Sequence, residues 1–128
     1  MMSFTRVTLG DGKPALQVMA GGQTYNLRVR LLSKEMVETP GGCDIALHAE
    51  AYRVDDSGAP MTVSMPDGSQ VEDKAPSRKK TISGAALAEG SLTLADQQKD
   101  LMQECIKGYI AWKVSQVQLD AASDELVQ

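Results

Sequence analysis

The chain has 128 residues, of which 42% are hydrophobic and 23% are charged, and its formal net charge is −4. These values are typical of one folded domain over residues 1–128, and the acidic balance argues against a nucleic-acid partner, which needs basic surface to displace the counterions of phosphates. No window approaches a membrane-spanning length of apolar residues, and the first residues lack the order of a signal peptide, which predicts a cytoplasmic protein with no membrane partner.

Short apolar runs separated by glycine turns predict a β meander in the first part of the chain. Residues 4–9 and 15–20 are two such runs, with turns at Gly10–Gly12 and Gly21–Gly22. A third run, residues 23–31, alternates strictly. Because successive strand residues point to opposite faces, this run should bury one set of side chains: Tyr25, Leu27, Val29 and Leu31.

The other face of the same strand carries Arg28 and Arg30. Both should lie in solvent, where they would form a small positive ridge. The polar segment 33–42 then predicts a connector, with a helical turn at 34–37.

Two further strands are expected before residue 66. Residues 44–54 alternate between apolar and polar side chains, although their alanines leave a helix open as the alternative. Met61–Met65 alternates again, and the following Pro66-Asp67-Gly68-Ser69 is a turn sequence. The sheet region therefore spans residues 4–65, with about five mainly antiparallel strands.

Residues 66–92 are poor in apolar side chains and predict an extended loop or arm, a kind of segment that usually has a function when it is long. It contains the basic cluster Arg78-Lys79-Lys80, which could contact an acidic protein surface or phosphate. The chain has one Phe and one Trp, too few aromatic rings for stacking bases. A protein-contact role for the cluster is therefore favoured.

The strongest pattern predicts one long helix over residues 93–121, with Thr93 as N-cap and Asp96 in the first turn. Such a helix is roughly 40 Å long, whereas the radius of gyration of a compact chain of this size is about 14 Å, so the helix must cross the whole domain or project from it. Its apolar stripe recurs at three- and four-residue steps: Leu94, Leu101, Met102, Cys105, Ile106, Tyr109, Ile110, Val114 and Val117.

These elements predict an α+β fold, a mainly antiparallel sheet with one long C-terminal helix packed across one face. Tyr109 and Trp112 lie on that helix and are candidates for the core or, if the helix projects, for an interface. Gly108 in mid-helix costs about 1 kcal/mol relative to Ala, which suggests a close approach by another backbone segment.

No catalytic, cofactor or metal signature stands out. His48 is the single histidine, so a metal site with several imidazoles is excluded, and a catalytic site would have to combine it with Asp44 or Cys43. Cys43 and Cys105 are far apart and match neither a disulfide framework nor a C-x-x-C pair. Both should be small reduced core residues, and the protein should not be an enzyme.

A β meander, turns such as the one in Tyr52-Arg53-Val54-Asp55-Asp56-Ser57-Gly58-Ala59-Pro60, an arm and a long terminal helix together resemble small virion proteins of tailed bacteriophages. The resemblance implies a non-enzymatic subunit of a capsid surface, neck, tail or baseplate, present in many copies. The residues alone also favour a structural or assembly subunit that forms a homo-oligomer or larger assembly, with Arg78, Lys79, Lys80, Tyr109 and Trp112 as interface residues. The alternative is a small cytosolic adaptor that binds one protein partner through Arg28 and Arg30.

Overall fold

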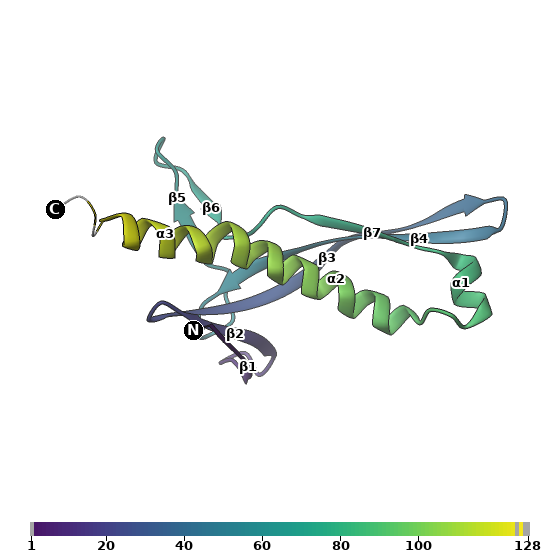
Figure 1. Cartoon of the computed structure of the whole chain (residues 1–128), viewed down its shortest axis with the longest axis horizontal. Coiled ribbons are helices and arrows are strands. Elements are labelled where there is room, and N and C mark those ends of the chain that lie inside the picture. The colour runs from purple at the N-terminus through teal and green to yellow at the C-terminus, as the bar shows by residue number, and fades with distance from the viewer. Residues whose placement is uncertain (1, 125, 127–128) are drawn as a thin grey trace.

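A computed structural model describes residues 2–124 and 126, in which helical segments cross one face of an antiparallel sheet (Figure 1). The five-stranded sheet has the order β1-β2-β3-β4-β7, and β5 pairs with β6 in a separate hairpin. The bounds of the strands are β1 Ser3–Thr8, β2 Pro14–Ala20, β3 Gln23–Thr39, β4 Gly42–Val54, β5 Thr62–Ser64, β6 Gln70–Glu72 and β7 Arg78–Ile82. The helical segments are α1 Gly84–Glu89, α2 Leu94–Tyr109, the π-helical η1 Ile110–Val114 and α3 Ser115–Asp124.

The mainly antiparallel α+β fold is as the sequence predicts. Strands β1 to β4 follow one another as hairpins, at the positions expected for residues 4–9, 15–20, 23–31 and 44–54. The strand expected at Met61–Met65 forms as β5, but it pairs with β6 across the predicted turn and not with the main sheet. Its place in that sheet is taken by β7, which pairs with β4.

The connector and helical turn expected over residues 33–42 are wrong. β3 continues to Thr39, with a bulge between Leu31 and Ser33, and reverses into β4 through Pro40-Gly41. This end of the hairpin extends away from α2 (Figure 1), and most of its side chains are exposed on both faces. Alternation of apolar and polar residues arises from burial of one face, so a strand exposed on both faces lacks the pattern. We call residues 31–44 the β3–β4 arm.

The extended arm expected over residues 66–92 is also wrong, because this segment contains β6, β7 and α1. β7 forms an outer edge of the main sheet, where lysines are common since their charge prevents pairing with other sheets. The Arg78-Lys79-Lys80 cluster that suggested a loop is therefore the sequence of an edge strand.

The single long C-terminal helix expected over 93–121 is wrong as stated, because α2 ends at Tyr109, well before the end of the chain, and η1 and α3 follow. The predicted start is confirmed: the Thr93 hydroxyl accepts a hydrogen bond from the Asp96 amide at 3.2 Å. Leu101, Cys105 and Tyr109 are buried at four-residue steps, but the next buried residue is Val114. An α-helix turns by about 100° per residue, so a five-residue step would rotate Val114 by about 140° from Tyr109.

The π-helical turn of η1 removes this mismatch, because its wider turn brings residues five apart onto one face. Both Tyr109 and Val114 can then reach the sheet. The side chain of Val117, the last residue of the predicted stripe, lies outside the described residues.

The core lies between α2 with η1 and the facing side chains of β2, β3, β4 and β7. At its centre the rings of Tyr25 and Tyr109 meet edge to face, with centroids 6.4 Å apart. Of the two cysteines, Cys105 is buried here as expected, and burial raises the pKa of its thiol. Cys43 is exposed at the arm, so its predicted core position is wrong. In the described part of the chain, no helix has the length and apolar character to span a membrane.

Candidate interaction surfaces

The basic cluster Arg78-Lys79-Lys80 lies on β7, where successive side chains point to opposite faces of the sheet. Arg78 and Lys80 face α2. The guanidinium of Arg78 lies beside Gly108, where an added Cβ would sit 3.2 Å from Nη2, and Lys80 pairs with Asp100 at 3.8 Å. Lys79 points to the other face. The three residues therefore do not form one basic surface. Gly108 makes room for the Arg78 side chain, so the expected approach of another backbone segment is wrong.

Tyr109 belongs to the core of the chain itself, with 0% of its surface exposed. Its hydroxyl donates to Oδ1 of Asp73 at 3.0 Å, and Asp73 is itself only 3% exposed. Lys113 and Arg53 lie 3.7 Å and 4.0 Å from the same carboxylate. Burial, together with the nearby Asp73 charge, raises the pKa of Tyr109 well above its usual range. Tyr109 thus fixes the helix to the sheet and is not available as a surface contact.

Trp112 is the candidate interface residue on η1 that remains accessible, with 47% of its surface exposed. Its ring packs edge to face on Tyr109, with centroids 6.2 Å apart, and Lys113 Nζ lies 5.4 Å from the Trp112 ring centroid. The inner edge of the indole is therefore held in place by the core, and the outer part faces solvent. An interface role for Trp112 stays a prediction.

The expected positive ridge of Arg28 and Arg30 does not form, because carboxylates pair with both guanidiniums. Arg28 binds Asp11 through two hydrogen bonds of 2.6 Å and 2.8 Å. Arg30 pairs with Glu72 and, at 3.4 Å, with Glu50, and it lies over the Tyr52 ring. The strand face that alternation assigns to solvent is thus a network of paired charges.

The Arg28–Asp11 pair predicts a loss of stability in acid. The hydrogen bond from Arg28 and the amide of Lys13 hold the pKa of Asp11 well below its usual range. The unfolded chain, with an ordinary Asp pKa of about 3.9, then binds more protons than the folded chain, so stability is present above that pH and is lost as pH falls below it. We expect Asp11→Asn to lower the urea midpoint at neutral pH and to flatten its decline below about pH 4.

Trp112 fluorescence provides the readout for these urea titrations, since the chain has one tryptophan. Asp124→Asn, at the exposed end of α3, is the matched control and should leave the profile unchanged. An Asp11→Asn profile that coincides with that of the wild type would show that the Arg28 pair contributes nothing.

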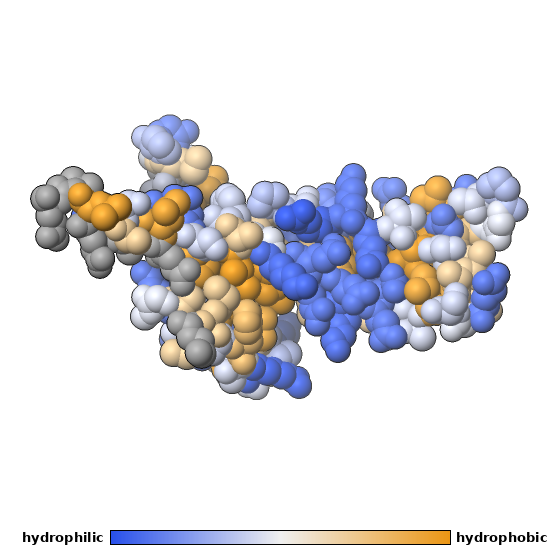
Figure 2. Space-filling model, in the orientation of Figure 1, coloured by the Kyte–Doolittle hydropathy of each residue, from blue (hydrophilic) through white to orange (hydrophobic). Residues whose placement is uncertain are grey.

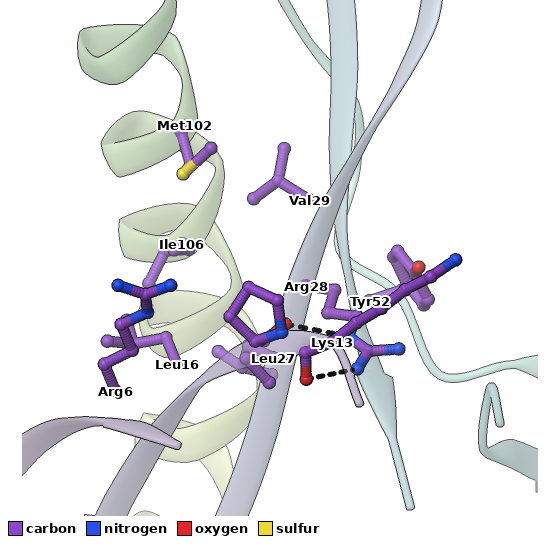
Figure 3. A pocket seen from close by; sticks show the side chains of 11 residues that line it. Arg6, Lys13, Leu16, Leu27, Arg28, Val29, Tyr52, Met102 and Ile106 are labelled. Atoms are coloured by element: carbon purple, nitrogen blue, oxygen red, sulfur yellow. Dashed lines mark hydrogen bonds between the residues drawn. The ribbon is translucent and has the colours of Figure 1, made fainter. Parts of the chain in front are cut away.

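A groove of about 610 Å³, which the sequence did not indicate, lies beside α2 over β2 and β3 (Figure 3). Leu16 and Leu27 form its floor, and Met102 and Ile106 form the wall on α2. Arg6 stands at the rim near α2, and Lys13 lines the far side, where its side chain extends toward Tyr52. Apolar surface is gathered at this place in Figure 2. We call it the α2–β2 groove. The one signal in the sequence was the width of the helix stripe, because Met102 and Ile106 lie beside the residues that face the core.

The β3–β4 arm is a second apolar surface. Four of its large apolar side chains are at least 44% exposed: Leu31, Leu32, Met36 and Val37. Met36 and Val37 fall in the segment that was expected to be a polar connector. Leu31 was expected on the buried face of the strand over residues 23–31, and this expectation is wrong because Leu31 is 55% exposed. Sequence reasoning therefore missed this surface as well.

The groups that a histidine-based active site would need are not brought together. His48 Nε2 lies 2.6 Å from Ser77 Oγ, whereas Asp44 accepts a hydrogen bond from the amide of Gly84. Cys43 and Asp44 precede His48 on the same strand by four or five residues, a separation of about 13–17 Å at the rise of a β-strand. Within residues 2–124 and 126, no group of three or more His, Cys, Asp or Glu side chains is placed to hold a metal ion.

The described surface thus offers three candidates for contact with other molecules: the α2–β2 groove, the β3–β4 arm and the exposed edge of Trp112. Comparison with known proteins adds no further constraint. The chain matches no protein-family model, no curated protein and no solved structure at a significant level.

Proposed function

We propose that this chain is a non-enzymatic structural or assembly subunit that makes repeated protein–protein contacts. One observation carries the proposal: large apolar side chains are exposed together on the parts of the chain that extend past the core. On the β3–β4 arm, Met36 is 63% exposed, and on α3, at the other end of the molecule (Figure 1), Leu119 is 59% exposed. Single exposed apolar residues are normal on a monomer, whereas the arm exposes four of them within seven residues, Leu31, Leu32, Met36 and Val37.

The shape of the chain supports the same function. The hairpin of β3 with β4 and the helical run from α2 to α3 give the molecule two extended ends (Figure 1). Past Ile45, where the pairing with β7 ends, the hairpin has two strands and is supported by α1 at Cys43 and Asp44. A two-stranded ribbon gains little stability from its own contacts, and α3 packs chiefly against η1, the segment that it continues. Contact with neighbouring subunits would bury the apolar side chains that these ends expose.

Because the sequence resembles virion proteins of tailed bacteriophages, we propose that the assembly is a virus particle that contains many copies of the subunit. The alternative, an adaptor that binds one partner through Arg28 and Arg30, has less support. Both guanidiniums are paired with carboxylates of the chain, and a partner would have to displace these contacts.

Solution mass tests the proposal. We expect light scattering coupled to size exclusion, from low micromolar to near-millimolar protein, to give a mass that rises above the 13.7 kDa of one chain and reaches a defined oligomer or a polymer series. The apolar exposure of the arm and of α3 is the physical reason. A monodisperse species of 13.7 kDa at every concentration would contradict the assembly function.

A further inference from the structure

We infer that the α2–β2 groove is the docking site for the C-terminal end of a second copy of this chain, α3 together with Leu126. The inference rests on the proposed function and specifies which surfaces of the subunit meet. It joins two features that the fold leaves without a counterpart. One is an apolar groove with a basic rim, and the other is an acidic helix end with exposed leucines.

The groove combines an apolar floor with positive charge. Leu16 and Leu27 line the floor, and no carboxylate is among the described residues that line the groove. Arg6 stands at the rim and Lys13 lines the far side, and neither side chain forms an ion pair with a described residue. On the α2 wall, Lys99 precedes Met102 by one turn and so lies on the same side of the helix. An occupant should therefore be apolar along its length and acidic at its margins.

The end of the chain has this composition. Leu119 lies on α3 and is 59% exposed, and Leu126, two residues beyond the end of α3, is 85% exposed. After Lys113 the sequence contains Asp120, Asp124 and Glu125 but no basic residue. The segment thus presents leucines and carboxylates, which complement the floor and the rim of the groove.

The occupant has to come from another copy, because α2 is itself a wall of the groove. α2, η1 and α3 follow one another without a break, so the α3 of the same chain runs on along the helix and away from the groove (Figures 1 and 3). Returning to the groove would require unwinding η1, where Val114 is fully buried. A neighbouring molecule can supply the segment without any change in fold.

Such a contact joins two different surfaces, so it is heterologous. Each copy has one groove and one C-terminal end, and every molecule can therefore bind one neighbour in front and one behind. Repetition of this contact gives a closed ring or an open filament and not an isologous dimer. The order of subunits would be head to tail.

Two variants that each remove one half of the contact test the inference. Leu119→Ser with Leu126→Ser disables the helix end, and Arg6→Glu with Met102→Glu disables the groove. We expect each variant alone to self-associate at least about tenfold more weakly than the wild type, because burying a leucine contributes about one factor of ten or more. An equimolar mixture of the two should form a 1:1 heterodimer that grows no further, since one intact groove meets one intact end.

Charge reversal provides a second readout that depends less on folding. Lys13→Glu should weaken self-association, Asp120→Lys should weaken it as well, and the two changes in one chain should restore it. Met65→Ser, an exposed apolar residue beside the β5–β6 hairpin, is the matched control and should leave the mass distribution unchanged. Circular dichroism and urea midpoints compare the folding of every variant with the wild type.

The outcomes separate this inference from the proposed function. If the wild type assembles and the groove and helix-end variants assemble equally well, the docking site is wrong and the assembly function stands. If the two variants are monomeric and their mixture is monomeric too, the head-to-tail contact is wrong. If the wild type stays at 13.7 kDa throughout, both the function and the docking site fail.

Discussion

Replacing Tyr109 with alanine should lower the free energy of unfolding by about 3–5 kcal/mol, the cost of removing a large buried aromatic ring. The ring lies at the centre of the core, against Tyr25 on one side and Trp112 on the other. Its hydroxyl also donates to the buried carboxylate of Asp73. Urea unfolding monitored by circular dichroism measures the change, since the Trp112 signal itself depends on Tyr109.

Tyr109→Phe separates the ring from the hydroxyl. Loss of the donor leaves Asp73 with the more distant Lys113 and Arg53, at 3.7 Å and 4.0 Å, and should cost about 1–3 kcal/mol. Tyr52→Phe is the matched control, because the Tyr52 ring stays beneath Arg30 and its hydroxyl has no hydrogen bond among the described residues. Equal stability of Tyr109→Phe and the wild type would show that the Asp73 contact contributes nothing to the fold.

Gly84→Ala should be the second severe substitution, and its cause is steric. A Cβ at Gly84 would lie 1.7 Å from the carbonyl oxygen of Cys43, a backbone atom that no rotamer change can move. The amide of Gly84 also donates to Asp44 at 3.0 Å, so separating the two segments breaks this bond too. We expect a loss of about 3 kcal/mol or more, seen as a fall in Tm of roughly 10 °C.

Gly108→Ala is the matched comparison. The nearest atom to its Cβ would be Arg78 Nη2 at 3.2 Å, the end of a flexible side chain. Alanine is favoured over glycine within a helix by about 1 kcal/mol, so this variant should be as stable as the wild type or more so. If the Gly84→Ala protein had the same Tm as the Gly108→Ala protein, the steric explanation would be contradicted.

The sequence predicts those elements whose side chains divide into an apolar face and a polar face. Tyr25 and Leu27 alternate with Asn26 and Arg28 because one face of β3 packs on the helix, and that alternation is visible without a structure. The start of α2 is equally visible, since Thr93 caps it through its own side chain. In both cases the sequence pattern and the element that it predicts depend on residues within that one segment.

The remaining elements depend on contacts between distant segments. Met36 and Val37 are exposed on the arm, so no buried face imposes a pattern on that part of β3. In the sequence, Arg78 and Lys80 resemble loop residues. In the structure both face α2, where Asp100 pairs with Lys80. Likewise, the pairing of Arg28 with Asp11 joins two strands through a turn, and charge patterning within one strand does not contain it.

The candidate interaction surfaces follow the same rule. Trp112 could be proposed from the helix alone, and 47% of its surface is exposed. The α2–β2 groove could not, because Leu16 and Met102 become neighbours only when the sheet and the helix are assembled. Tyr109 and Trp112 were candidates on the same helix, but only Tyr109 belongs to its apolar stripe, and Tyr109 is buried whereas Trp112 is half exposed.

The order of the elements along the chain also has a consequence during synthesis. Strands β1 to β4 are complete by Val54, whereas the side chains that cover their inner face, from Leu101 to Val114, are made last. At about 5–20 residues per second, the ribosome needs roughly 3–12 s to add the intervening residues. For that time the nascent sheet carries Val18, Tyr25 and Leu27 without their cover. The growing chain is then most prone to pair with its neighbours on the same messenger, before the helix that organises the finished subunit exists.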